Sequence, residues 1–160
     1  MNIRNATIED IQAITKVEMT CFPKAEAATE EDFRNRLRVY PNHFWLLEDD
    51  KKLVSFINGM VTNEDTLTDE MYENVDLHNE NGQWQMIFGV NTIPEYRRQG
   101  CAEKLMRKVI SDAKDQGRKG LVLTCKDMLV HYYEKFGFKN EGKSDSTHGG
   151  AIWYNMRLTL

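Results

Sequence analysis

The sequence predicts a single α/β domain, and three observations support that fold class. Short apolar stretches typical of strands alternate along the chain with stretches whose apolar residues recur at the three- and four-residue spacing of a helix. The clearest helix, over residues 102–113, lies between two strand patterns and therefore predicts a right-handed strand–helix–strand unit. No repeat, linker or low-complexity segment interrupts residues 1–160, so we expect one domain.

The N-terminal part is expected to hold a short strand at residues 3–5 and two helices. The first helix begins at the cap residue Thr7 and runs to about Cys21, because apolar residues recur along one face of it. These apolar residues are Ile11, Ile14, Met19 and Phe22. Thr29 begins a capping pattern, and the second helix runs from there to about Val39.

Two strands and an acidic segment follow. Residues 43–48 and 53–61 read as the strands of a hairpin, with a turn between them. Residues 62–83 are irregular and acidic, with a short helix expected at 69–75. The apolar stretch 84–92 then predicts a central strand.

The C-terminal part is expected to continue as helix, strand, helix and strand. The helix after the central strand has one continuous apolar face, formed by Ala102, Leu105, Met106, Val109, Ile110 and Ala113. Gly117 is its expected C-cap, and residues 121–124 form the next buried strand. A short helix at 129–136 and a last strand at 151–158 complete the chain.

Composition limits the classes of function. With 41% apolar and 29% charged residues the chain is typical of a soluble globular protein, and its net charge of −4 argues against a general nucleic-acid binder. No apolar run is long enough to cross a bilayer and the first residues lack an apolar signal core, so we expect a cytoplasmic protein with no membrane partner. The three cysteines show no metal-binding spacing and are expected to be reduced thiols, with no metal site.

The most informative segment is residues 90–102, a strand end that leads through a basic turn containing a glycine into the amphipathic helix. Free backbone N–H groups and a partial positive charge at a helix start, together with the adjacent Arg97 and Arg98, are typical of a phosphate-binding site. The chain has no Gly-Lys-Ser/Thr sequence, which excludes a Walker loop, and Gly100 stands without the further glycines of a dinucleotide fingerprint.

The turn instead matches the pattern Arg/Gln-x-x-Gly-x-Gly/Ala through Arg97, Gly100 and Ala102, and a Tyr-x-x-x-Gly-Phe sequence follows at residues 133–138. In this order the two motifs resemble those of the GNAT superfamily of N-acetyltransferases. The resemblance implies a mixed, mostly antiparallel central sheet flanked by helices, and acetyl-coenzyme A as the acyl donor. It also implies that the backbone of Val90, Asn91 and Thr92 pairs with the pantetheine arm. The pyrophosphate would be held by the loop Arg97, Arg98, Gln99, Gly100, Cys101, Ala102 and Glu103.

Within that superfamily the chain is similar to the arylalkylamine N-acetyltransferase group. The similarity lies in residues 123–138, in residues 53–59 with the acidic segment after them, and in residues 21–28. Vertebrate members of the group have two histidines on the central strand. The corresponding positions here are Met86 and Phe88 or, with a longer loop, Trp84 and Met86, so the proton route of those enzymes is absent from this strand.

The resemblance makes Tyr133 the candidate general acid, since it matches the family tyrosine beside the coenzyme sulfur. A phenol with a pKa of about 10 is protonated at neutral pH and can protonate the leaving thiolate. The alternative is a packed aromatic residue on a short helix. For the proton acceptor three candidates stay open: His131, His148, and a water chain that ends on a carboxylate such as Glu26.

Two further features have competing interpretations. Seven carboxylates between Glu64 and Glu80, with no Lys or Arg from Leu53 to Tyr96, could steer a cationic amine toward the site, or could simply be a solvated acidic surface. Cys101 lies at a helix start, which can lower a thiol pKa, but acyl transfer from a coenzyme needs no cysteine nucleophile, so we interpret it as a spacer in the phosphate loop.

Together these features predict an acetyl-coenzyme A-dependent N-acetyltransferase that acts by direct attack on the primary amine of a small molecule, an arylalkylamine or a polyamine. The alternatives are a protein or peptide N-acetyltransferase and a non-catalytic coenzyme A-binding module. The expected partner is a small-molecule amine and not a nucleic acid, and the protein is expected to be a monomer or a homodimer.

Overall fold

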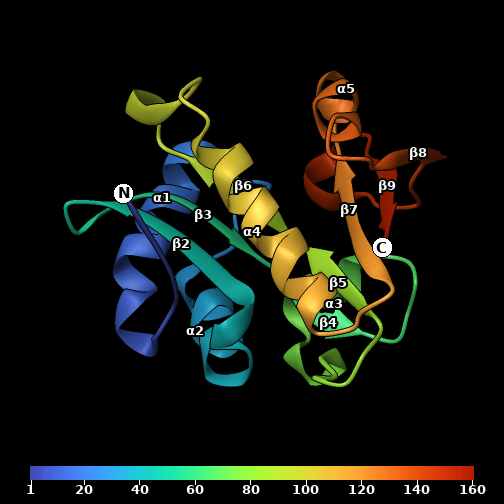
Figure 1. Cartoon of the computed structure of the whole chain (residues 1–160), viewed down its shortest axis with the longest axis horizontal. Coiled ribbons are helices and arrows are strands. Elements are labelled where there is room, and N and C mark those ends of the chain that lie inside the picture. Colours follow the sequence, from blue (N-terminus) through green and yellow to red (C-terminus); the bar gives the residue numbers. More distant parts are fainter. The chain divides into compact units, whose positions relative to one another are not determined.

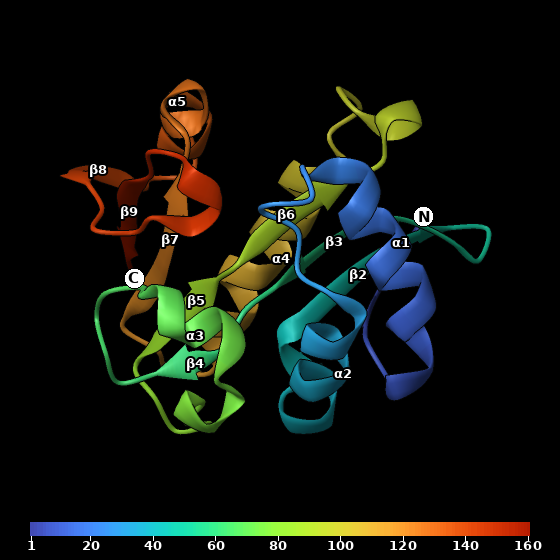
Figure 2. The same ribbon diagram turned by 180° about the vertical axis from the view of Figure 1, so that it is seen from behind.

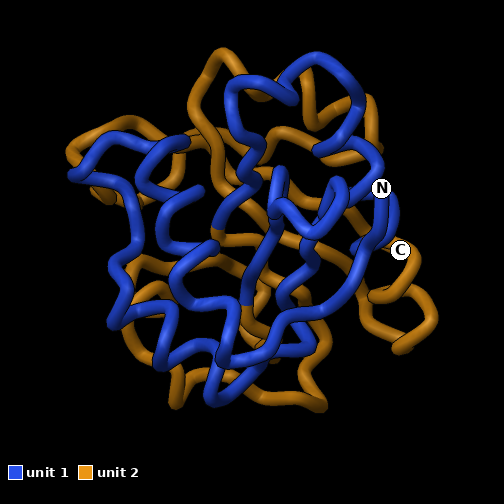
Figure 3. The backbone as a smooth tube through the Cα atoms, turned by 90° about the vertical axis from the view of Figure 1, so that its left-hand side faces the viewer, with its two compact units in different colours: residues 1–59, 89–109 blue, residues 60–88, 110–160 orange.

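A computed structural model describes all residues 1–160. The chain forms two compact units: residues 1–59 with 89–109, and residues 60–88 with 110–160 (Figure 3). Each unit has its own β-sheet, and only one of the seven strand pairings is parallel. The expected mixed, mostly antiparallel α/β fold is therefore confirmed, with its strands divided between two sheets.

The first unit contains a four-stranded antiparallel sheet in the order β1-β2-β3-β6. Its strands are β1 (Asn2–Asn5), β2 (Phe44–Asp49), β3 (Lys52–Asn58) and β6 (Gly89–Thr92). Helices α1 (Ile11–Cys21) and α2 (Glu30–Val39) cover one face of this sheet, and the first part of α4 (Cys101–Asp115) covers the other (Figures 1 and 2). Short 3-10 turns complete the unit at Ile8–Asp10, Pro41–His43 and Pro94–Tyr96.

The helix starts in this unit are fixed by side chains that the sequence identifies. Thr7 accepts a hydrogen bond from the backbone of Glu9 and forms a capping box with Asp10, and Thr29 forms another with Asp32. Below the second cap, the buried ring of Phe33 meets sheet residues edge to face. Its centroid lies 6.2 Å from that of Phe44 and 5.9 Å from that of Phe56, which shows that α2 packs on the face that carries these two side chains.

The second unit contains a five-stranded sheet in the order β4-β5-β7-β9-β8. Its strands are β4 (Val61–Thr62), β5 (Trp84–Ile87), β7 (Gly120–Cys125), β9 (Tyr154–Thr159) and β8 (Lys139–Lys143). The parallel pair is β5 with β7, so the predicted strand–helix–strand unit is confirmed as β5–α4–β7. Helices α3 (Asp69–Glu73) and α5 (Val130–Glu134) and 3-10 turns at Val75–Leu77, Asp127–Leu129 and His148–Gly150 lie in its loops.

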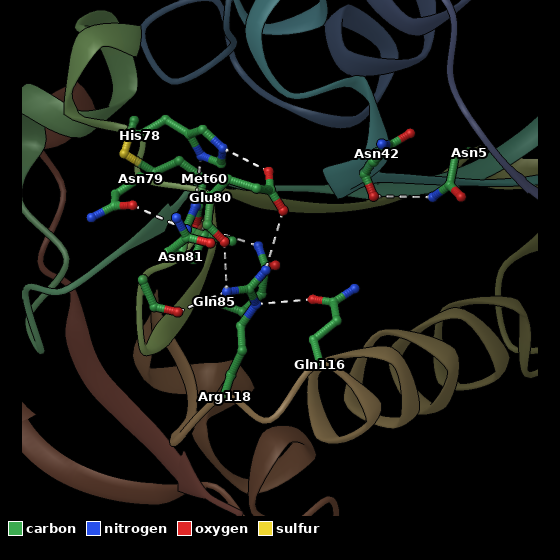
Figure 4. Close-up of polar contacts among 12 residues, drawn as sticks. Asn5, Asn42, Met60, His78, Asn79, Glu80, Asn81, Gln85, Gln116 and Arg118 are labelled. Atoms are coloured by element: carbon green, nitrogen blue, oxygen red, sulfur yellow. Dashed lines mark hydrogen bonds and ion pairs between the residues drawn. The ribbon is translucent and has the colours of Figure 1, made fainter.

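A buried arginine ties the loop before β5 to the end of α4 (Figure 4). The Arg118 guanidinium donates to the backbone carbonyls of Glu80 at 3.1 Å and Gly82 at 2.7 Å, and to the side chain of Gln116 at 2.9 Å. It also forms an ion pair with the Glu80 carboxylate at 3.3 Å. Burial lowers the pKa of Arg118 by desolvation, partly offset by Glu80, so the contacts compensate a buried charge.

The sequence misplaced several strand boundaries. The predicted strand 53–61 is divided, since β3 pairs in the first sheet and β4 in the second. The predicted central strand 84–92 is likewise divided at Phe88 into β5 and β6. Gly59 and Gly89 lie at these two breaks, and glycine in a strand interior weakens it because it has no side chain to pack.

The sequence analysis also missed one strand and misplaced one residue of the first helix. Strand β8 was not predicted, because its burial pattern is almost entirely exposed and offers no apolar alternation. Met19 was placed on the buried face of the first helix but is 69% exposed, whereas Val17 and Glu18 are buried. Within α1 the buried face is formed by Ile11, Ile14, Val17 and Glu18, which recur at three- and four-residue spacing, and Met19 lies off that face.

Candidate active site

The basic turn is fixed to the first sheet by contacts from both of its ends. Tyr96 donates a hydrogen bond of 2.7 Å to the Asp49 carboxylate, and Lys52 lies over the Tyr96 ring at 5.7 Å. The Arg97 Nε atom donates to the carbonyl oxygen of Thr92 at 3.0 Å. These contacts hold the turn between β6 and α4 against the first sheet.

The turn leaves a row of backbone N–H groups at the start of α4. The first helical hydrogen bond runs from the Lys104 N–H to the carbonyl of Gly100 at 3.0 Å, and the N–H groups of residues 98–102 donate to no acceptor in the protein. Arg98 and Gly100 have positive φ angles of 62° and 78°. Alternation of such residues with helical ones directs successive N–H groups to one side, which is the geometry of an anion-binding nest.

Gly100 leaves this site open. It is exposed, and a Cβ placed on it would meet no heavy atom within 4 Å. The glycine is therefore required by its positive φ and not by packing against the protein. A side chain here would stand in free space at the helix start, where an anionic ligand would approach.

The remaining side chains of the predicted phosphate loop divide into exposed and buried ones. Arg98 and Gln99 are exposed, and Gln99 donates to the carbonyl of Glu95 at 3.0 Å. Glu103 forms an ion pair with Arg107 at 3.5 Å, while Ala102 is half-buried. Cys101 is 4% exposed, and burial raises the pKa of its thiol in spite of the helix start and the opposing charge of Lys104.

Strand β6 is an edge strand of the first sheet, and its backbone alternates in direction. The Ile93 N–H donates to Val54 on β3, and the Asn91 carbonyl accepts from Ser55 Oγ at 2.6 Å, so these groups point toward β3. The Thr92 carbonyl points the opposite way, since it accepts from Arg97 and from Cys21 Sγ at 3.3 Å. By alternation the backbone groups of Val90 and the Thr92 N–H face the free edge.

Tyr133, the predicted acid, lies on α5 in the second unit. Its side chain is 6% exposed and meets the rings of Tyr132 and Phe138 edge to face, at 5.1 and 6.1 Å between centroids. Burial raises the pKa of Tyr133, and the neighbouring Tyr132 and Cys125 contribute in the same direction. The phenol is therefore held in its protonated form over a wide pH range.

Comparison with known proteins decides the family. The protein-family model of the acetyltransferase (GNAT) domain matches the chain over residues 2–140. This chain belongs to the GNAT acetyltransferase family. The expected resemblance is thus confirmed, together with acyl transfer as the activity and acetyl-coenzyme A as the donor.

Individual relatives of this GNAT chain are distant. It is 25% identical to serotonin N-acetyltransferase of Mesocricetus auratus over 161 residues, which cover 98% of the chain and 76% of that protein. It is 28% identical to N-acetyltransferase 8 of Homo sapiens over 104 residues, which cover 63% of the chain and 40% of that protein. The solved structure of a GNAT-like decarboxylase, GphF, in complex with isobutyryl-CoA superimposes with a TM-score of 0.85 at 17% identity, covering 99% of both chains.

The candidates for the proton acceptor of the GNAT chain have different environments. His131 lies on α5 with its side chain fully in solvent, 3.8 Å from Glu134. His148 is half-buried and stacks on Tyr72 at 4.8 Å with an interplanar angle of 13°. Glu26 is half-buried in the loop after α1. Full solvation of His131 makes it the weakest candidate of the three.

The acidic segment of the GNAT chain is partly structural. Asp69 accepts hydrogen bonds from Ser146 Oγ at 2.5 Å and from the Thr147 N–H at 3.1 Å, and Glu80 pairs with Arg118. At least two of the seven carboxylates therefore have a role in holding the fold, which favours the structural interpretation for those two.

No helix in the chain is both long enough and apolar enough to span a membrane.

The sequence missed one feature of the first unit. Asn91 was predicted to contribute through its backbone, yet its buried side chain has no hydrogen-bond partner. Its neighbour Asn58 on β3 is also buried, and it accepts a hydrogen bond from Arg36 at 3.0 Å. The only signal in the sequence was two asparagines in otherwise strand-forming segments, where asparagine is disfavoured.

Proposed function

We propose that this GNAT acetyltransferase acts on the primary amine of a small molecule, an arylalkylamine or a polyamine. The similarity to serotonin N-acetyltransferase, which extends over 98% of the chain, is the observation that favours a small acceptor. The chain is proposed to act as a single catalytic domain over residues 1–160.

In this proposal the donor is held by main-chain groups. The N–H groups of residues 98–102 bind the pyrophosphate, with Arg97 and Arg98 supplying positive charge beside it. The free backbone groups of Val90 and Thr92 pair with the pantetheine arm, as a further strand would. Gln99, Cys101, Ala102 and Glu103 shape the start of α4, and Asn91 keeps β6 in register with β3.

The chemical step needs a neutral amine and an acid. The amine nitrogen attacks the carbonyl carbon of the thioester, the C–S bond breaks, and the acetyl group becomes an amide. The departing thiolate takes the proton of the Tyr133 hydroxyl. The nitrogen, which becomes positively charged as it attacks, loses a proton to solvent through water, and Tyr133 regains a proton from solvent before the next turnover. Because burial raises the pKa of Tyr133, its hydroxyl stays protonated at the alkaline pH at which more of the amine is neutral.

Replacing Tyr133 with Phe tests this role. The variant keeps the ring contacts with Tyr132 and Phe138 but lacks the proton, so kcat is expected to fall by about 100-fold, in the range of a lost general acid. Release of free coenzyme A thiol across a panel of amines measures it.

In the wild-type protein kcat/KM should rise with pH and show no alkaline decline below about pH 10.

Tyr132→Phe is the matched control, since it removes the adjacent hydroxyl and is expected to leave kcat within about twofold. If Tyr133→Phe retained full turnover at every pH, Tyr133 would be a packing residue only. Transfer to peptides and to no small amine would favour a peptide acetyltransferase, and coenzyme binding without transfer to any amine would favour a non-catalytic module.

A further inference from the structure

Residues 144–153, the segment between β8 and β9, are fixed against α3 within the second unit. The Asp69 carboxylate accepts hydrogen bonds from Ser146 Oγ at 2.5 Å and from the Thr147 N–H at 3.1 Å. Ser146 Oγ in turn accepts from the His148 N–H at 3.2 Å. These contacts place the backbone of His148 beside α3, although the segment contains no regular structure except one 3-10 turn.

The imidazole ring of His148 is held in place as well. It stacks on Tyr72 at 4.8 Å with an interplanar angle of 13°, and its centroid lies 5.9 Å from that of the Trp153 ring. Trp153 Nε1 donates a hydrogen bond of 2.8 Å to the His148 carbonyl, which keeps the two residues together. The ring contacts therefore orient the imidazole, while His148 remains partly exposed to solvent.

The surroundings of His148 are open to small molecules. Gly149 and Gly150 follow it, and both are exposed and have positive φ angles, of 61° and 71°. A Cβ placed on Gly150 would meet no heavy atom within 4 Å. Ile152 is 63% exposed. A ligand can therefore approach this part of the segment from solvent without displacing packed side chains.

His148 and the proposed acid Tyr133 border the same strand end in the second unit. Cys125 is the last residue of β7, and its thiol contributes to the raised pKa of Tyr133. Lys126 follows it and places its Nζ atom 5.7 Å from the centroid of the Trp153 ring, which contacts His148. Figure 2 shows the segment of His148, in red, below α5. A proton donor and a possible proton acceptor thus lie at the carboxyl end of β7.

The other three histidines are less suited to exchange a proton with a substrate. His43 is only 1% exposed. In His78 both ring nitrogens are engaged, because Nδ1 accepts from the Val61 N–H at 3.1 Å and Nε2 lies 3.0 Å from the Glu80 carboxylate. The side chain of His131 stands fully in solvent. The fourth histidine alone combines partial exposure with an oriented ring.

We propose that His148 is a catalytic residue, the base that takes a proton from the bound ammonium form of the acceptor before the amine attacks acetyl-coenzyme A. An N–H bond of the ammonium breaks, its electron pair stays on the nitrogen, and the proton forms an N–H bond with the imidazole. The imidazolium then releases this proton to solvent. The inference rests on the proposed function, because it supplies the neutral amine that the proposed reaction requires.

Charged groups of both signs occur on the elements that pack against the ring. The titratable groups are Asp69, Glu70, Tyr72 and Glu73 on α3, and Lys126 beside Trp153. The carboxylates of α3 carry the charge opposite to that of the imidazolium, and the lysine carries the same charge.

The pH dependence of kcat/KM tests the inference, with phenethylamine and putrescine as probes. Imidazole side chains ordinarily titrate near pH 6.5 and alkylammonium groups near pH 10. With a base that accepts the proton, kcat/KM of the wild-type enzyme is expected to rise to about pH 7 and then to stay constant to about pH 10.

His148→Phe keeps a ring to stack on Tyr72 but has no nitrogen that accepts a proton. Only amine that is already neutral in solution then reacts. The kcat/KM of this variant is expected to be about 100-fold lower at pH 7 and to rise about tenfold per pH unit toward the wild-type value near pH 10. His148→Gln is a second variant that also lacks the base and should give the same profile.

Two controls separate proton transfer from a structural role. Fluorine atoms beside the amine lower its pKa, so more of β,β-difluorophenethylamine or 2,2-difluoroputrescine is neutral at pH 7, and His148→Phe should lose at most about fivefold with these acceptors. His131→Gln removes the fully solvated imidazole and should keep the wild-type profile.

The inference and the proposed function fail in different ways. If the wild-type enzyme acetylates the probes and both His148 variants keep its pH profile, or lose the same factor with fluorinated and unfluorinated amines, the inference is overturned while the proposed function stands. Loss of the constant region in His131→Gln instead overturns it too. A wild-type protein that acetylates no amine overturns the proposed function and, with it, the role of His148.

Discussion

At the scale of single residues, burial decides the chemistry more often than sequence position does. Cys101 begins a helix, a place that can lower a thiol pKa, yet burial raises it. Cys125 on β7 is buried too, and burial raises the pKa of its thiol to about 11. Cys21 is half-buried, and burial outweighs the hydrogen bond from Arg97 to raise its pKa also.

These shifts predict a protein with no reactive thiol at neutral pH. Because only the thiolate reacts, labelling of the native protein with iodoacetamide at pH 7.5 should be much slower than that of a free cysteine, and slowest at Cys125. Mass spectrometry of the labelled peptides measures each rate, and the urea-unfolded chain is the control. A stoichiometric reaction of native Cys101 at the rate of a free thiol would show that the helix start lowers its thiol pKa more than burial raises it.

At the scale of elements, the 3-10 turn before α1 is stabilised by a capping box whose aspartate also forms an ion pair. Asp10 completes the capping box with Thr7 and also accepts from both terminal nitrogens of Arg4, at 2.9 and 2.7 Å. Partial burial raises the pKa of the Asp10 carboxyl, but the hydrogen bonds from Arg4 and Thr7 outweigh it, so its pKa is lowered. Arg4 reaches Glu48 on β2 as well, at 2.8 Å, so this cluster joins the cap to the sheet.

A carboxyl group whose pKa is lower in the folded state than in the unfolded state stabilises the fold at pH values above its unfolded-state pKa of about 4. This stabilisation is lost as the pH falls through the folded-state pKa. Asp10→Asn is therefore expected to reduce the free energy of unfolding at pH 7 by about 1–2 kcal/mol, with the difference disappearing toward pH 2. Urea denaturation across this range measures it. Asp32→Asn at the cap of α2 should reduce the free energy of unfolding by less, because Asp32 completes a capping box without an arginine. A difference for Asp10→Asn that persists unchanged at pH 2 would contradict the charge-based explanation.

The sequence predicted local structure well wherever chemistry is local. The caps at Thr7 and Thr29 and the positive φ of Gly100 and Gly117 follow from residue type and near neighbours. The division of residues 84–92 at Phe88 could not be predicted, because it depends on β5 pairing with β7 and β6 with β3, far along the chain. The unpaired side chain of Asn91 was also hidden, since a missing hydrogen bond is visible only once its surroundings are known.

At the scale of the whole molecule, the family assigns the reaction and the chain's own residues modify it. The resemblance aligns the two histidines of the vertebrate arylalkylamine enzymes with Met86, which is fully buried, and Phe88, which packs on Tyr72 at 4.8 Å, or, with a longer loop, with Trp84 and Met86. None of these side chains can accept a proton, so deprotonation of the amine must use other groups. The donor site that we propose does not depend on these strand side chains, because it consists mainly of backbone N–H groups at the start of α4.

The proposed reaction depends on binding of the acetyl-coenzyme A pyrophosphate at the start of α4. Calorimetric titration of the intact protein tests it most directly, with Gly100→Val as the matched variant. The wild-type protein should bind one equivalent, and the affinity should fall with salt because the ligand is anionic. Gly100→Val should weaken binding at least tenfold, since valine disfavours a φ of 78° and would stand where the phosphate approaches. Failure of the wild-type protein to bind, or equal affinity of Gly100→Val, would show that the start of α4 does not hold the pyrophosphate.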